Sequence, residues 1–262
     1  MSLFPVGVLI AVAAFVAAVK HLNQGFGSYF DLVAFLMVTG GTVAVAVILI
    51  PWNLRRDLIR CARELVKPVS LDHKSVLTNC ISTIKSRTLV VDEHAQDEIY
   101  ATILKDGLEL IELGFNDARI ESILIERLRS FSVRRRKIAN AIRNLAKYPP
   151  AFGLMGTVLG LVNVMRGVST GGDGKQTALE MAIALVATMY GLIISNLIVN
   201  PAGELILRKT SEHEAFGEIA IESICLLAKN VSILESQEIL NSYAPIEHRI
   251  NVLKDEFGDL AA

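Results

Sequence analysis

Small and hydroxylated residues recur at helical spacing inside two apolar stretches of this chain. The first stretch carries Gly153, Gly156, Thr157 and Gly160, which fall within about two turns of a helix. The second stretch places small or polar residues three or four positions apart, so that they share one face: Glu180, Ala184, Thr188, Gly191 and Ser195. A face of this kind suits either close packing against another helix or the wall of a pore.

A simpler alternative exists for each of these residues taken alone. Glycine and threonine are tolerated in membrane helices, and a threonine hydroxyl can bond to its own backbone. The joint pattern on two stretches favours a functional role, because Pro150 and Pro201 also stand at the ends of these stretches. A proline frees a backbone carbonyl and makes a bend point, so both prolines are candidate conformational hinges.

The elements that would position these residues are membrane spans. The chain has 262 residues, 52% of them hydrophobic, and a mean hydropathy of +0.46, which is too apolar for an average soluble domain. Apolar residues gather in four runs, at 3–19, 32–50, 151–165 and 178–199. A span needs roughly 20 apolar residues. The sequence therefore predicts an all-α integral membrane protein with four transmembrane helices and a cytoplasmic helical domain. The first run is a retained helix and not a signal peptide, because no positive residue precedes its apolar core.

Positive residues indicate the orientation of the spans. They cluster after the second run and before the third, at Arg55, Arg56, Arg60, Arg63, Lys67, Arg134, Arg135, Arg136, Lys137, Arg143 and Lys147. Positively charged loops stay in the cytoplasm, so the segment between these runs and both termini are expected there. The predicted organisation is spans 1 and 2 in 1–50, a cytoplasmic helical insert in 51–147, spans 3 and 4 in 148–201, and cytoplasmic C-terminal helices with a tail in 202–262.

Periodicity predicts that the cytoplasmic insert is helical. Apolar residues recur at three- and four-residue spacing in 57–66, 75–85, 98–113 and 118–147. Gly114 is the expected end of one helix, and Asn116 or Asp117 is the expected cap of the next. The segment 118–147 lacks proline and glycine, so it is expected to run as one helix into the third span.

The residues needed for catalysis or metal binding are not grouped in this sequence. The three cysteines, Cys61, Cys80 and Cys225, lack metal-ligand spacing, and neither a nucleophile constellation nor a phosphate-binding glycine loop occurs. No enzyme activity, metal, cofactor or nucleic-acid partner is expected. No aspartate, lysine or histidine lies at the middle of a span. If the protein couples to an ion gradient, a partner chain must supply the carboxylate that binds the ion.

Two motifs resemble those of a known family. The segment 150–162, Pro-Ala-Phe-Gly-Leu-Met-Gly-Thr-Val-Leu-Gly-Leu-Val, is similar to Pro-Ala-x-Gly-Met-Ile-Gly-Thr-x-x-Gly-Leu-Val of the MotA/PomA family of flagellar stator A subunits. The similarity continues through 181–191, Ser195, Asn196 and Pro201, and includes Gly40 and Gly41 in the second run. The order of spans, insert and tail also matches that family over the whole chain.

The resemblance implies a motility protein of the bacterial inner membrane. It implies a ring of five copies around a dimer of a B subunit, which carries the ion-binding aspartate and a peptidoglycan-binding domain. Thr157 and Thr188 would line the ion route, and Pro150 and Pro201 would be the hinges. The glycines Gly153, Gly156, Gly160 and Gly191 would pack the helices against one another. The ring would lie in membrane lipid, and its cytoplasmic part would turn the C-ring protein of the flagellar rotor.

Two details refine this expectation. Sodium-driven relatives often carry a threonine where this chain has Ala187, so protons are favoured over sodium as the transported ion. The rotor-facing charged pair of the family is not fully in register here. Lys85, Arg87, Asp92 and Glu93 are the candidates for rotor contact, and a solvated charged face is an equal alternative for them.

Two other functions remain open at the level of sequence. One is a related ion-driven motor that powers a different machine, such as an ExbB/TolQ-like unit. The other is a static membrane scaffold that assembles partners without ion flux. The scaffold predicts that replacing Thr188 or Pro150 leaves function intact.

Overall fold

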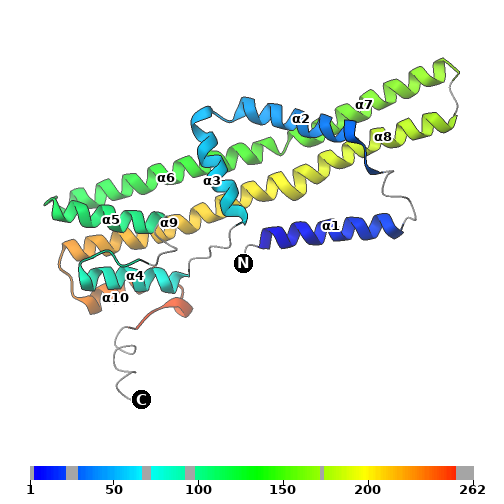
Figure 1. The fold of residues 1–262 in the computed structure, drawn as a ribbon. Helices are drawn as coiled ribbons and strands as arrows, with labels where there is room; N and C mark the ends of the chain where they lie inside the picture. The colour runs from blue at the N-terminus through cyan, green and yellow to red at the C-terminus, as the bar shows by residue number, and fades with distance from the viewer. Residues whose placement is uncertain (1–2, 22–28, 67–71, 92–97, 172–173, 252–262) are drawn as a thin grey trace. The chain divides into compact units, whose positions relative to one another are not determined.

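The computed structural model describes residues 3–21, 29–66, 72–91, 98–171 and 174–251. Within these ranges every regular element is a helix (Figure 1). The elements up to the third span are α1 (Leu3–His21), α2 (Leu32–Leu49), η2 (Trp52–Leu54), α3 (Arg55–Val66), α4 (His73–Ser86), α5 (Ile99–Glu112) and α6 (Asp117–Leu145). They are followed by α7 (Tyr148–Ser169), α8 (Gly174–Ile193), the π-helix η4 (Ile194–Val199), α9 (Asn200–Ala228), α10 (Ile233–Asn241) and η5 (Ile246–His248). The all-α prediction is confirmed.

The chain divides into two compact units, each built from segments that are distant in sequence. The first unit comprises Met1–Val69 and Arg135–Leu207, and the second comprises Ser70–Arg134 and Arg208–Ala262. The long helices α6 and α9 contribute residues to both units. The predicted division into four consecutive segments stays a prediction.

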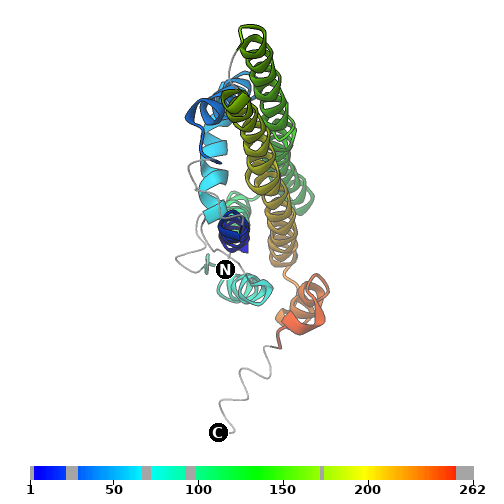
Figure 2. The same ribbon diagram turned by 90° about the vertical axis from the view of Figure 1, so that its right-hand side faces the viewer.

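The first unit contains the apolar helices α1, α2, α7 and α8. Among the described residues, three helical stretches are long and apolar enough to cross a membrane: Leu32–Leu49, Asp117–Ser169 and Thr177–Ala228. A fourth apolar helix, Pro5–His21, is shorter. Within this unit α7 and α8 lie side by side, as Figures 1 and 2 show from two directions, and α2 packs against both of them. The four apolar helices occur in the predicted order.

The second unit has its own hydrophobic core, formed by α4, α5, α10 and the adjoining parts of α6 and α9. Its fully buried large side chains include Leu77, Tyr100, Ile103, Leu104, Ile120, Leu124, Ile219, Ile224 and Leu240. The Asn79 amide donates a hydrogen bond of 3.2 Å to the Tyr100 hydroxyl, which satisfies two buried polar groups. Burial raises the pKa of the Cys80 thiol to about 12. This thiol therefore stays protonated at neutral pH and packs as a small apolar side chain.

Helix ends in the second unit follow the residues that were expected to set them. Helix α5 ends at Glu112, and Gly114 adopts a φ of +73°, a conformation that glycine reaches without steric cost. The Asn116 side chain accepts a hydrogen bond of 3.2 Å from the Ala118 N–H at the start of α6. The predicted stop and the predicted cap at Asn116 are both confirmed.

The expected run of one helix into the third span is interrupted. A turn at Ala146 and Lys147 separates α6 from α7. The cause lies just downstream, because Pro149 and Pro150 have no backbone N–H to continue the helical hydrogen-bond ladder. The break therefore falls where the sequence removes two consecutive donors.

Candidate functional site

Glycines on α7 allow its backbone to touch that of α8. A Cβ atom added at Gly153 would lie 2.9 Å from both the Ala187 carbonyl oxygen and the Thr188 Cα. One added at Gly156 would lie 2.6 Å from the Ala187 Cβ. Real Cβ atoms do not approach other heavy atoms so closely, so these positions require glycine for the helices to keep this separation.

The close approach extends along both helices. A Cβ atom at Gly160 would overlap the Ala184 Cβ. One at Gly191 on α8 would overlap the Pro149 carbonyl oxygen and would lie 3.0 Å from the Pro150 Cα. All four glycines singled out from the sequence thus lie at the contact between α7 and α8.

The two candidate pathway threonines meet at the centre of this contact. The Thr157 and Thr188 hydroxyl oxygens are within hydrogen-bond distance of each other. The Thr188 hydroxyl also lies 3.2 Å from the Gly153 carbonyl oxygen. The Thr157 hydroxyl lies 3.2 Å from the carbonyl oxygens of Gly153 and Ala184. Four oxygen atoms from two helices therefore share one small volume, which we call the hydroxyl notch.

The hydroxyl notch has more acceptors than donors. Each threonine hydroxyl carries one proton and two lone pairs, and each carbonyl adds two further lone pairs. Two protons cannot satisfy this set, so the notch can accept a hydrogen bond from water or from a protonated group. Both threonine side chains are only partly buried, which leaves them accessible to such a group. Ala187 is 2% exposed and adds no oxygen to the notch, since its methyl group faces Gly156.

The first proline hinge candidate lies at the break between α6 and α7. In a continuous helix the Ala146 carbonyl would accept the N–H of residue 150, but Pro150 has none. The Ser195 hydroxyl takes its place and donates a hydrogen bond of 2.5 Å to the Ala146 carbonyl oxygen. Ser195 is 5% exposed, so this bond satisfies a carbonyl that water does not reach freely.

The second proline hinge candidate lies beside an irregular stretch of helix. Pro201 is the second residue of α9, and the π-helix η4 precedes it directly. The Asn200 N–H bonds to the Ser195 carbonyl, which is five residues back and not four. A π-helical turn of this kind often marks a functional site in a helix. Because Ser195 also bonds to Ala146, one residue joins the two proline breaks.

Two residues, Ser195 and Tyr190, make hydrogen bonds that were not predicted from the sequence. Ser195 was placed on the small-residue face, but its bond across to Ala146 was not foreseen. The signal was available, because Pro150 leaves the carbonyl four residues before it without a helical partner. Tyr190 was not given a role. Its hydroxyl donates a hydrogen bond of 2.7 Å to the Tyr29 carbonyl oxygen and accepts one of 3.2 Å from the Asp31 N–H. Tyr190 thereby ties α8 to the start of α2.

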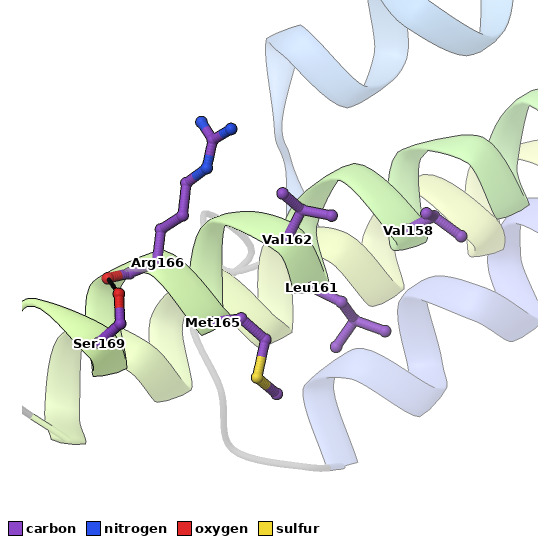
Figure 3. A pocket seen from close by; sticks show the side chains of 6 residues that line it. All are labelled: Val158, Leu161, Val162, Met165, Arg166 and Ser169. Atoms are coloured by element: carbon purple, nitrogen blue, oxygen red, sulfur yellow. Dashed lines mark hydrogen bonds between the residues drawn. The ribbon is translucent and has the colours of Figure 1, made fainter.

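A shallow groove of about 420 Å³ lies on a different face of α7 (Figure 3). Its lining is mainly apolar, and Arg166 and Ser169 add a cation and a hydroxyl at one end. The lining residues are Val158, Leu161, Val162, Met165, Arg166 and Ser169. The Ser169 hydroxyl donates a hydrogen bond of 2.8 Å to the Arg166 carbonyl oxygen. The apolar lining suits contact with hydrocarbon, and it is separate from the hydroxyl notch.

The candidate rotor-contact residues belong to the second unit. Lys85 lies in the last turn of α4, and Arg87 follows the end of that helix; both are exposed. Asp92 and Glu93 lie outside the described residues. Within the described part of the chain, no group of three or more histidine, cysteine or acidic side chains could hold a metal ion.

Fold and site together define a class of protein: a helical membrane protein with a polar notch between two glycine-packed spans. The family model for the MotA/TolQ/ExbB proton channel family matches residues 95–216. The uncharacterized protein YtxD of Bacillus subtilis is 27% identical over 252 residues, which cover 92% of this chain and 90% of YtxD. Chemotaxis protein PomA of Vibrio alginolyticus is 25% identical over 209 residues, 78% of this chain and 80% of PomA.

A comparison of solved structures agrees with the sequence relatives. The chain matches a chain of the C. jejuni MotAB structure with a TM-score of 0.82 at 15% identity, covering 96% of this chain and 99% of that one. The chain therefore shares the fold of that MotAB chain. The chain is thus similar to MotA and PomA members of the MotA/TolQ/ExbB proton channel family: the family model matches just under half of it, and relatives named Motility protein A and PomA align with most of its length. The matched family is described as one of proton channels, and three helical stretches of the described residues are long and apolar enough to cross a membrane.

Proposed function

We propose that this chain is the A subunit of an ion-driven flagellar stator. Five copies form a ring around a dimer of a B-type subunit that carries a peptidoglycan-binding domain. Ions that cross the membrane between the ring and the dimer drive the ring to rotate about the dimer. The observation that carries the proposal is the hydroxyl notch, which lies between two close-packed spans and has spare acceptors.

The notch suits a shared ion route because it lacks a carboxylate of its own. No aspartate, lysine or histidine lies at the middle of a span in this sequence. Proton relays within membranes depend on such ionisable groups. The B subunit therefore supplies the aspartate, and Thr157 and Thr188 provide oxygen atoms beside it. This arrangement also supports a non-catalytic role, in which no bond of a substrate is made or broken.

Protons are the proposed coupling ion. Sodium must exchange its hydration shell for several fixed oxygen ligands, whereas a proton moves along hydrogen bonds. Ala187 presents a methyl group at the position beside Thr188, where a hydroxyl would add such a ligand. The notch as built has oxygen atoms from two threonines and two carbonyls, which suits hydrogen bonding.

The proposed orientation places the second unit in the cytoplasm. The proposed location is the bacterial inner membrane, with several spans in lipid and both termini in the cytoplasm. Positive residues at the ends of the spans support this orientation, since they favour the cytoplasmic side. The second unit would then face the rotor, and it would turn the C-ring protein through charged residues at its surface.

Replacement of Thr188 tests this proposal. In cells that lack their own A subunit, we expect the full chain with its B subunit to restore swimming. Thr188→Ala removes an oxygen from the notch, and rotation speed should fall about tenfold, which corresponds to ~1.4 kcal/mol in the ion-transfer step. Thr188→Ser keeps the oxygen and should retain most of the speed. Speed is measured on tethered cells, with the assembled A–B complex quantified in membranes.

Thr39→Ala is the matched control. The Thr39 hydroxyl is exposed on α2 and bonds within its own helix, to the Phe35 carbonyl oxygen at 2.6 Å. This variant should rotate as fast as the unmodified chain. A Thr188→Ala complex that assembles and rotates at full speed would contradict the role given to the hydroxyl notch. An unmodified complex that assembles without rotating would favour a static scaffold.

A further inference from the structure

Two non-glycine residues of the described chain adopt a left-handed backbone, and they are hydrogen-bonded to each other. Arg87 has a φ of 56° and Asn230 a φ of 55°. Arg87 Nη2 donates a hydrogen bond of 2.5 Å to Asn230 Oδ1. The two residues are 143 positions apart in sequence, and both belong to the second unit. Left-handed non-glycine residues are uncommon, so this pairing calls for a physical account.

Each of the two residues ends a helix. Arg87 follows α4, and its N–H bonds to the Thr83 carbonyl oxygen. Asn230 follows α9, and its N–H donates a hydrogen bond of 3.1 Å to the Leu227 carbonyl oxygen. The N–H of Val231 donates one of 3.1 Å to the Leu226 carbonyl oxygen. This is the Schellman pattern, in which the left-handed position accepts asparagine readily. Asn230 therefore suits its position as a cap.

Arg87 suits its left-handed position less well than Asn230 does. A left-handed conformation is unfavourable for a residue with a long side chain, and glycine would end α4 without that cost. The bond to Asn230 is exposed to water and so returns only a modest stabilisation. Its main effect is geometric, because it fixes the direction of a long and otherwise mobile guanidinium group.

Two lysines lie close to this pair in the sequence. Lys85 lies in the last turn of α4, and Lys229 directly precedes Asn230; both are exposed. The helix dipoles favour cations at the C-terminal ends of α4 and α9. The dipole does not account for the specific bond between Arg87 and Asn230. That bond uses one of the five N–H donors of the guanidinium group and leaves the planar fork able to receive a carboxylate.

We propose that Asn230 is a positioning residue, which holds the Arg87 guanidinium ready for a carboxylate on an acidic surface of the rotor. This inference rests on the proposed function, in which the second unit drives a rotor. It assigns the contact to Arg87 and adds a residue from the opposite end of the sequence to the contact surface. A preorganised fork loses less conformational freedom on binding, so Asn230 strengthens an interaction that it does not itself make.

The substitution Asn230→Asp separates positioning from a purely structural role. Aspartate tolerates the left-handed backbone and accepts the same hydrogen bond, so the fold is retained. Its negative charge also neutralises Arg87, so binding to an acidic rotor surface should weaken roughly tenfold, or about 1.4 kcal/mol. The full chain is expressed with its B subunit in cells that lack their own A subunit. Fluorescent stator units are counted at the motor. Swimming speed and the thermal midpoint of the purified A–B complex are measured.

Two further variants complete the test. Asn230→Gly keeps the backbone and removes the bond, so it should give an intermediate loss of recruitment. Asn116→Asp makes the same chemical change at an exposed cap in the same unit, where the side chain accepts the Ala118 N–H. Its recruitment and swimming should equal those of the unmodified chain.

The expected result is that Asn230→Asp keeps its thermal midpoint, its membrane level and its ion flux while recruitment falls. Equal recruitment of Asn230→Asp and the unmodified chain would overturn the inference, as would an equal loss in Asn116→Asp. An unmodified chain that assembles with its B subunit but drives no rotation would overturn the proposed function, and this inference with it.

Discussion

At the scale of single residues, the contact between α7 and α8 depends on glycines, because glycine has no Cβ atom. Gly191 lies against the backbone of Pro149 and Pro150, and a backbone cannot move aside as a side chain can. Gly40 on α2 is different, because a Cβ atom there would meet nothing within 4 Å. The two glycines therefore respond oppositely to the same substitution.

We expect Gly191→Ala to destabilise the assembled complex by about 1–3 kcal/mol, the usual cost of overpacking. Gly40→Ala should be neutral or stabilising by up to about 1 kcal/mol, because alanine favours a helix. The thermal midpoint of the detergent-solubilised A–B complex provides the comparison. If both variants melted at the temperature of the unmodified complex, the close contact at Gly191 would be incorrect.

The pairing of Thr157 with Thr188 was expected from the family resemblance, whereas other long-range hydrogen bonds were not expected. The resemblance implied that both threonines line one route, and the structure brings their hydroxyls together. The bond from Ser195 to Ala146 and the bond from Arg87 to Asn230 were not predicted. Both join residues far apart in the chain, and periodicity within one helix carries no information about such pairs.

At the scale of elements, the two proline breaks are joined through one side chain. The Ala146 carbonyl has lost its helical donor at the α6–α7 turn, and Ser195 supplies a donor from the π-helix η4. A change in one break therefore affects the other. Such a coupling supports the proposal that Pro150 and Pro201 act as conformational hinges.

Ser195→Ala should weaken this coupling. A buried carbonyl without a partner costs about 1–3 kcal/mol, so the thermal midpoint of the complex should fall and rotation should slow. Ser169→Ala is the matched control, since the Ser169 hydroxyl is exposed and bonds within its own helix. Rotation of tethered cells and thermal melting measure both effects. Equal behaviour of the two variants would contradict a structural link at Ser195.

Helix positions were largely predictable, and the interruptions less so. Apolar periodicity located α4, α5 and α6 to within a few residues, because each buries one face in the core of the second unit. The turn at Ala146 was missed because residues 118–147 contain no helix-breaking residue. The break is caused by prolines that follow it, and their effect acts on carbonyls several residues upstream.

At the scale of the whole molecule, the division into two compact units was not evident from the sequence. Composition separates apolar from charged segments along the chain, whereas each unit combines two distant segments. The apolar runs nevertheless gave the positions and order of the four apolar helices. The resemblance to the MotA/PomA family drawn from the two motifs is confirmed by the family-model match, by relatives named Motility protein A and PomA, and by the shared fold.

The most direct test of the central claim is the ion dependence of rotation. The full chain and its B subunit are expressed in cells that lack their own stator, and swimming is followed in sodium-free and sodium-containing media, with and without a protonophore. The account predicts swimming that persists without sodium and stops when the protonophore is added. Rotation that required sodium would contradict the role given to Ala187. An assembled complex whose motility is indifferent to both ions would contradict the stator itself.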